Sequence, residues 1–164
     1  MDRKPATNKA SAETVDKVEL WRSAADSWKR IKVAAETNLM RAELTVAEYR
    51  ILRVLKEHGS SPMNRFCPET MLSQPTITGI VDKLEQRGLA ERVRSKEDRR
   101  EVLIAITPKG SAAYAKGEEI HTRFVEKALS GLKPGELTQL VSLLENVADA
   151  SDLMIKEQGI ALPE

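Results

Sequence analysis

A basic stretch near the middle of the chain holds the side chains whose types and spacing point most directly to chemistry. Residues 92–100 carry five positive and two negative side chains, a net charge of +3. Two β-prone runs, residues 89–94 and 101–106, flank these charges and predict a β-hairpin with a charged tip. Cations clustered at such a tip attract phosphate groups. The alternative is an ordinary charged turn in water, which is the commoner fate of such runs.

The segment before the hairpin predicts an amphipathic helix. Ser73 suits the N-cap and Pro75 the first turn. The apolar face comprises Ile77, Ile80, Val81 and Leu84. The candidate contacts to nucleic acid on the other face are Ser73, Gln74, Thr76, Thr78 and Lys83. Short polar side chains in the first turns can meet base edges in the major groove, and Lys83 is better placed for phosphate. The alternative is that Ser73 only caps the helix and Thr76 is only solvated.

A helix followed by a basic-tipped hairpin is the outline of a winged helix, which reads nucleic acid. Upstream, Thr45 and Glu48 match a capping box that opens another helix, and Gly59 is suited to end it. Residues 60–62 are expected to form a turn, and residues 63–70 a short helix. These elements precede the recognition helix, as a helix-turn-helix requires.

Long helices are predicted at both ends of the chain. Apolar residues recur every three or four positions in residues 15–39, after Pro108 and after a break at residues 130–135. A small winged domain cannot cover these stripes alone, so we expect the terminal helices of two chains to intertwine in a homodimer. The predicted fold class is mostly α with a small β-hairpin wing, a winged helix-turn-helix reader plus N- and C-terminal dimerisation helices. The predicted division is a disordered lead-in at 1–13, a helical dimerisation region at 14–43 and 107–158, and a winged helix-turn-helix DNA-binding domain at 44–106.

The composition restricts the class of protein but does not indicate what the protein binds. The 164 residues are 41% apolar and 31% charged, with a net charge of +1, which fits one folded domain rich in helices. No apolar run reaches the roughly 20 residues needed to span a bilayer, and the N-terminus lacks the apolar core of a secretory signal. A single cysteine fits a reducing compartment. We therefore expect a cytoplasmic protein with no membrane association.

Three stretches resemble the MarR family (multiple antibiotic resistance regulators) of transcriptional regulators. They are LTVAEYRIL at 44–52, SQPTITGIVDKLEQRGLAERV at 73–93 and DRREVLIAITPKG at 98–110. They resemble, in order, the opening of the family's second helix, its recognition helix with the Gly-Leu-x-x-Arg exit, and its wing with an Asp-x-Arg pattern. One departure is that Phe66 and Cys67, followed by Pro68, stand where family members usually carry Leu-Ala. This departure leaves the angle between the two helices of the motif open.

The resemblance assigns roles to the charges of the wing. Arg100 occupies the Arg of the Asp-x-Arg pattern and is the candidate for insertion into a narrow minor groove. Asp98 would orient Arg100 through a charge-assisted hydrogen bond and tighten the turn. Arg94, Lys96 and Arg99 would neutralise phosphates and set the register on DNA.

The resemblance also implies a small aromatic or phenolic effector bound between the dimerisation helices and the reader. Trp21, Trp28 and Tyr49 are the candidate lining residues, although aromatics at helical spacing are more often plain core. Cys67 is interpreted as a packing residue, with a redox role left open. Neither a metal site nor a cofactor is expected, because the two histidines lack ligand partners at helical spacing.

The combined interpretation is a homodimeric repressor on a pseudo-palindromic operator in double-stranded DNA, released by a small molecule. The alternative is a winged-helix module that binds an acidic protein and not DNA. An enzyme is not expected, since the sequence offers no paired carboxylates, no nucleophile with a base and no phosphate-binding glycine loop.

Overall fold

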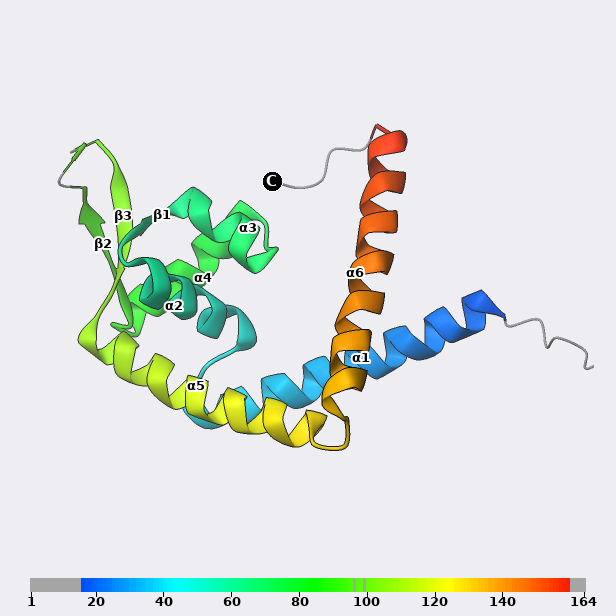
Figure 1. The fold of residues 1–164 in the computed structure, drawn as a ribbon. Coiled ribbons are helices and arrows are strands. Elements are labelled where there is room, and N and C mark those ends of the chain that lie inside the picture. The colour runs from blue at the N-terminus through cyan, green and yellow to red at the C-terminus, as the bar shows by residue number, and fades with distance from the viewer. Residues whose placement is uncertain (1–15, 96, 99, 160–164) are drawn as a thin grey trace, which may run out of the picture. The chain divides into compact units, whose positions relative to one another are not determined.

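The computed structural model describes residues 16–95, 97–98 and 100–159 (Figure 1). It divides into two units, the first ending at Ala34 and the second beginning at Ala35. Helix α1 (Lys17–Leu39) supplies the described part of the first unit and continues into the second. Asp16 caps it, accepting a hydrogen bond from the backbone amide of Val18 at 2.9 Å.

The second unit is mostly helical, with a small antiparallel sheet, as predicted. Its helical elements are η1 (Met40–Ala42), α2 (Val46–His58), η2 (Met63–Arg65), α3 (Phe66–Thr70), α4 (Gln74–Gln86), α5 (Pro108–Leu129) and α6 (Pro134–Glu157). Its strands are β1 (Ser61–Pro62), β2 (Ala90–Arg94) and β3 (Val102–Ile106). Among the described residues, no helix is both long enough and apolar enough to cross a bilayer.

The sheet has three strands in the order β1-β3-β2, so the wing is more than a hairpin. Strands β2 and β3 pair from Ala90 with Ile106 to Arg94 with Val102. The expectation of a simple turn at residues 60–62 is wrong, because Ser61 pairs with Ile104 at the far edge of β3. A strand of two residues has no periodicity to detect, and its partner lies more than forty positions away.

Local signals place the helix ends correctly. The capping box is present: the Thr45 hydroxyl accepts from the Glu48 amide at 3.1 Å, and the Glu48 carboxylate accepts from the Thr45 amide at 2.9 Å. Gly59 follows α2 with a φ of 73°, which suits a residue without Cβ. The Thr107 hydroxyl accepts from the Gly110 amide at 3.0 Å and starts α5. Each signal acts within a few residues, which is why the sequence predicts it well.

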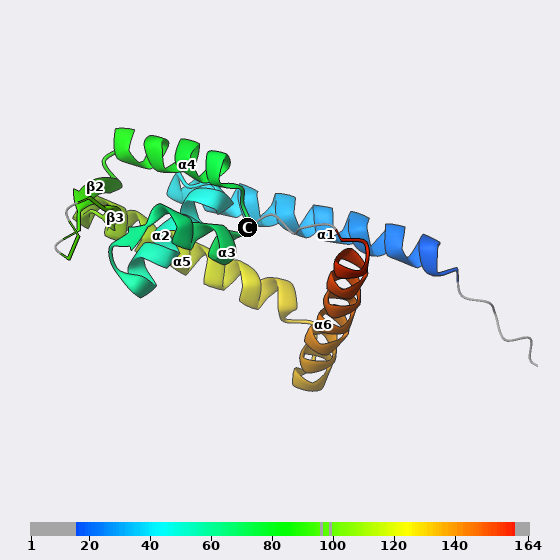
Figure 2. The same ribbon diagram turned by 90° about the horizontal axis from the view of Figure 1, so that it is seen from above.

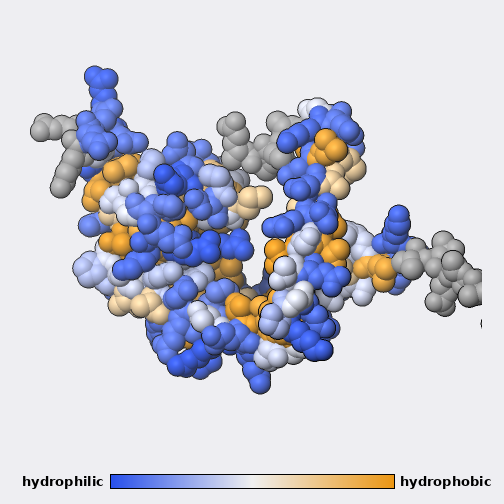
Figure 3. Space-filling view, in the orientation of Figure 1, coloured by the Kyte–Doolittle hydropathy of each residue, from blue (hydrophilic) through white to orange (hydrophobic). Residues whose placement is uncertain are grey.

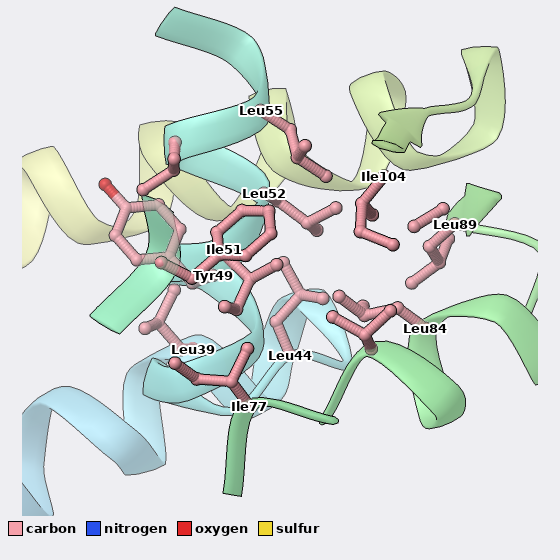
Figure 4. Packing of buried hydrophobic residues seen from close by; sticks show 14 of the residues in the cluster. Leu39, Leu44, Tyr49, Ile51, Leu52, Leu55, Ile77, Leu84, Leu89 and Ile104 are labelled. Atoms are coloured by element: carbon pink, nitrogen blue, oxygen red, sulfur yellow. The ribbon is translucent and has the colours of Figure 1, made fainter. Parts of the chain in front are cut away.

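The hydrophobic core joins α2, α4 and the sheet (Figure 4). Ile51 and Leu52 of α2 meet Ile77 and Leu84 of α4, all four fully buried. Phe66 is also fully buried and Cys67 is 8% exposed, in agreement with a packing role for this pair. The apolar face of α4 therefore packs into the core, and its other face is exposed at the surface of the second unit.

Helix α6 contributes no buried residue, although it is rich in leucine and valine. Figure 3 shows apolar surface along it, between charged positions. Its exposed apolar side chains include Leu140, Val141, Leu143, Leu144, Val147, Leu153 and Met154, between 42% and 58% exposed. In the first unit, α1 likewise exposes Val18, Leu20, Trp21, Trp28, Ile31 and Val33. Apolar stripes of this extent are typical of association surfaces.

Candidate nucleic-acid interface

Helix α4 presents a buried apolar face and an exposed polar face. Ile77, Val81 and Leu84 are fully buried. The predicted contact residues are all exposed: Ser73, Gln74, Thr76, Thr78 and Lys83. Figure 2 shows α4 along one edge of the second unit, with β2 and β3 following its C-terminal end. The structure thus brings the predicted helix contacts together on one open surface.

The hydroxyl groups on this surface are already engaged within the helix. Ser73 occupies the N-cap position, but its side chain makes no capping bond, which corrects the expected role. Its hydroxyl pairs instead with that of Thr76 at 2.8 Å. The Thr78 hydroxyl donates to the Gln74 carbonyl at 3.0 Å. The Thr78 side chain then offers an outside partner its methyl group and a hydroxyl oxygen that can only accept.

In the described part of the wing tip, side-chain oxygens of Asp98 and Ser95 accept hydrogen bonds from backbone amides. The Asp98 carboxylate accepts from the backbone amide of Arg100 at 2.9 Å. The expected bond from Asp98 to the Arg100 guanidinium is not found among the described residues, so Asp98 shapes the turn and leaves that guanidinium exposed. The buried Ser95 accepts from the Asp98 amide at 3.3 Å. Arg94 is exposed at the end of β2, and Lys96 and Arg99 lie outside the described residues.

Arg92 joins the recognition helix to the wing, a role that the sequence interpretation missed. Its guanidinium contacts Asp82 at 2.7 Å and also pairs with Glu85, both on α4. Its backbone amide donates to Glu85 at 3.0 Å. The hydrogen bond with Asp82 is the main reason that the pKa of Arg92 is raised. The sequence held a signal for this link: Asp82 and Glu85 are three positions apart and so share one face of the helix, and Arg92 follows in the next strand.

The C-terminal end of α4 is fixed by a second set of polar contacts. The Arg87 guanidinium binds the Glu48 carboxylate at 3.0 Å and the Glu43 carbonyl at 2.5 Å. The Lys109 ammonium donates to the Arg87 carbonyl at 2.7 Å. These bonds connect the end of α4 to Glu43 after η1, to the first turn of α2 and to the first turn of α5.

The three candidate effector residues have different environments. Trp21 and Trp28 lie seven positions apart on α1, 63% and 56% exposed. Tyr49 belongs to the second unit and is buried. Its hydroxyl donates to Glu118 at 2.6 Å, and Tyr114 donates to the same Glu118 oxygen at 2.8 Å. The hydroxyl of Tyr49 is therefore already used in joining α2 to α5.

This cluster shifts the pKa of each of its three members. Burial, followed by the hydrogen bond to Glu118, raises the pKa of Tyr49 above its ordinary value. The same two causes raise the pKa of Tyr114 to about 12. The hydrogen bond from Tyr49 lowers the pKa of Glu118. Sequence reasoning missed the cluster because Tyr49 and Glu118 are 69 positions apart.

An exposed polar helix face, an adjoining basic wing and side chains that fasten the two together define a winged helix-turn-helix DNA-binding protein. Residues 44–102 match the family model described as MarR family. The chain is 31% identical to the HTH-type transcriptional regulator FarR of Neisseria gonorrhoeae, over 68% of this chain and 79% of that protein. It is 30% identical to the homoprotocatechuate degradative operon repressor of Escherichia coli, over 62% of this chain and 70% of that one.

A solved structure of a probable transcriptional regulator from Pseudomonas aeruginosa has the same fold. The two structures superpose with a TM-score of 0.68 and are 28% identical in sequence. The match covers 80% of this chain and 97% of that chain. The chain belongs to the MarR family and is a helix-turn-helix transcriptional regulator. These relatives favour DNA binding over the alternative of a module that binds only protein.

Proposed function

We propose that the protein is a homodimeric repressor that binds a pseudo-palindromic operator in double-stranded DNA and is released by a small molecule. The observation that carries this proposal is the exposed polar face of α4, held beside the wing by Arg92. This arrangement suits insertion of one helix into a major groove while the wing reaches the neighbouring minor groove.

The proposed DNA contacts follow from these positions. Gln74 and Thr78 would meet base edges, and Ser73, Thr76 and Lys83 would contact bases or phosphates. Arg100 would enter the minor groove, and Asp98 would hold the turn beneath it. The phosphate contacts proposed for the rest of the wing are Arg94, Lys96 and Arg99.

Dimerisation is proposed through residues 14–43 and 107–158, with 44–106 as the DNA-binding domain. The exposed apolar residues of α1 and α6 support it, because water-exposed stripes of this length are costly unless another surface covers them. A two-fold dimer would present two copies of α4, and the operator would then carry two related half-sites.

Repression and release by a small molecule are proposed from the names of similar proteins. One relative of 30% identity is named a repressor of an operon for degradation of homoprotocatechuate, an aromatic acid. An aromatic or phenolic effector is proposed for this protein on that basis, with Trp21, Trp28 and Tyr49 as lining residues predicted from the sequence. We also propose a cytoplasmic protein without enzymatic activity.

The test is fluorescence anisotropy with the intergenic DNA upstream of the protein's own gene, at two salt concentrations. Binding that weakens steeply with salt, at two half-sites about one helical turn apart, is the expected result. No binding to that DNA, and none to genomic fragments selected at low salt, would refute the proposal in favour of a protein-binding module.

A further inference from the structure

The turn between α3 and α4 carries the most exposed large apolar side chain in the described part of the chain. Met71 is 88% exposed, and the next, Met40, is 67% exposed. The residues on either side of Met71 are anchored, because Thr70 is buried and Leu72 packs partly buried against the core. The fold therefore holds the chain on both sides of Met71 and leaves its side chain in water.

The backbone of Met71 adopts a conformation that methionine rarely takes. Its φ is 57°, in the left-handed region, at the position that follows the last residue of α3. Many helices end in this way, but the residue is usually glycine, because a Cβ crowds the backbone there. Among the described non-glycine residues, only Glu43 also has a positive φ, again 57°. Glycine would make the same turn with less strain, so the fold itself gives no reason for a methionine.

The turn is held in place without the Met71 side chain. The Met71 amide donates to the Cys67 carbonyl at 2.9 Å. The Thr70 hydroxyl donates to the Phe66 carbonyl at 2.6 Å, and the Arg50 guanidinium of α2 donates to the Thr70 carbonyl at 3.2 Å. A substitution at Met71 therefore removes the side chain and keeps the bonds that shape the turn.

Met71 lies two residues before Ser73, the N-cap of α4. In a helix-turn-helix, the first turns of the recognition helix enter the major groove and the preceding helix crosses the DNA backbone. The turn that joins the two helices then lies at the edge of the groove. Thymine is the base that presents a methyl group there, and the unbranched thioether chain of methionine adapts its shape to such an apolar group.

A protein partner is a poorer match for this side chain. The exposed residues nearest to Met71 in the chain are polar: Glu69, Ser73 and Gln74. The apolar surface of this segment is therefore confined to one side chain, whereas stable protein interfaces bury about 800 Å² on each partner. A single apolar contact suits the recognition of one methyl group.

We propose that Met71 is a further specificity-determining residue, whose thioether side chain contacts the methyl group of one thymine in each half-site of the operator. This inference rests on the proposed function and adds a residue to its DNA interface. It also accounts for the strain, since a methionine that is unfavourable for folding is then useful when DNA is bound. Removing the side chain is expected to stabilise the fold and to weaken DNA binding, two effects of opposite sign.

The test uses the full-length protein and a genomic fragment that the wild type itself selects. Each thymine of the fragment is replaced in turn by deoxyuridine, which lacks only the methyl group. Competition anisotropy should show that the wild type loses about three- to tenfold in affinity at one thymine position per half-site. Met71→Gly should bind the unmodified fragment more weakly by a similar factor and lose nothing further at that position. Met71→Leu, which keeps an apolar side chain, should remain sensitive to deoxyuridine there.

Glu43→Gly is the matched control. It relieves the same left-handed conformation and keeps the carbonyl that accepts from Arg87. Both glycine variants should melt about 2–4 °C higher than the wild type. Only Met71→Gly should weaken DNA binding, because only its side chain is placed at the groove.

Unchanged affinity in Met71→Gly, or the same response to deoxyuridine in Met71→Gly and the wild type, would overturn the proposed contact. A lower melting temperature of Met71→Gly would also overturn it, because the side chain would then be holding the turn. Each of these outcomes leaves the proposed function standing, since the wild type has bound its fragment. If the wild type selects no fragment, the proposed function fails before any variant is measured, and this inference fails with it.

Discussion

The guanidinium of Arg92 in β2 lies 2.7 Å from the carboxylate of Asp82 in α4. The two elements are already joined by the short turn around Gly88, which has a φ of 67°. The ion pair adds a second connection, one turn further back along the helix. The angle between recognition helix and wing is therefore set by side chains as well as by the turn, and both must match one DNA surface.

Arg92→Ala is expected to weaken DNA binding more than it weakens the fold. The pair with Asp82 is partly exposed, so its loss should cost no more than about 1 kcal/mol of unfolding free energy. DNA affinity should fall further, because α4 and the wing lose their fixed angle. A double-mutant cycle with Asp82→Ala, measured by anisotropy and urea unfolding, separates the two effects. Additive losses in DNA affinity would contradict the coupling.

Arg100→Ala should weaken DNA binding, lower its salt dependence and leave folding and dimerisation intact. The guanidinium is exposed at the tip, while the contact that orders the turn uses the Arg100 backbone amide, which alanine keeps. The slope of log affinity against log salt is expected to become less steep, because the interface loses one positive charge and binding releases fewer counterions. Lys116→Ala serves as the control for a lost surface charge. Normal affinity of Arg100→Ala in a salt titration would remove Arg100 from the interface.

Thr78 is predicted to read DNA through its methyl group, because its hydroxyl has given its proton to the Gln74 carbonyl and can only accept a further hydrogen bond. Thr78→Val keeps the methyl and loses the hydroxyl, and Thr78→Ser does the opposite. Preference among operator variants, measured by competition anisotropy, should survive in the valine variant and change in the serine variant. A uniform loss of affinity across all operator sequences in the serine variant would instead mark Thr78 as a phosphate contact.

Gly79 lies in the exposed middle of α4, and a Cβ built there meets nothing within 4 Å. Packing therefore gives no reason for a glycine at this position. Glycine in a helix interior also costs about 1 kcal/mol of stability relative to alanine. Gly79→Ala should raise the melting temperature by about 2–4 °C. It should also weaken DNA binding if this exposed face of α4 enters the major groove as proposed, because the added methyl group would then meet the DNA. Gly135→Ala, equally open on α6, is the control and should leave DNA binding unchanged. Unchanged DNA affinity in Gly79→Ala would leave this glycine without a role at the interface.

The cluster of Tyr49, Tyr114 and Glu118 predicts a pH window for stability. Because the pKa of Glu118 is lower in the folded state, its contribution is present above the ordinary value of 4.5 and is lost as pH falls through the folded value. The tyrosine pKa values are raised, so their contribution is present below 10.0 and is lost as pH rises through about 12 for Tyr114. Glu118→Gln should flatten the fall of urea stability at acid pH. Glu126→Gln, which changes an exposed carboxylate on the same helix, is the control.

Tyr49→Phe tests the same cluster at neutral pH. It removes the donor of a buried hydrogen bond and should cost about 1 kcal/mol in urea unfolding. A cost equal to that of Tyr114→Phe would mean that the two bonds contribute alike, and no cost in either would remove the cluster from the stability of the α2–α5 contact.

The sequence predicted the features that depend on neighbouring residues, and it missed the contacts between residues far apart in the chain. Thr45 caps its helix as expected, since a cap depends on the next three residues. Ser61 was assigned to a turn because its strand partner, Ile104, gives no local signal. The same holds for the candidate DNA-binding site. The spacing of apolar residues predicted the exposed face of α4, whereas the ion pair between Arg92 and Asp82 depends on how β2 folds back along the helix.

Helix α5 runs from Pro108, one residue after the cap beside the wing, to Leu129. Its 22 residues make a rod about 33 Å long. A tilt of about 5° about one end of such a rod moves the other end by about 3 Å. Because the Lys109 ammonium donates to the Arg87 carbonyl, a tilt of α5 about its C-terminal end would carry the end of the recognition helix with it. A change of a few degrees in how α5 is held in the proposed dimer would therefore become a shift of a few ångström at the recognition helix.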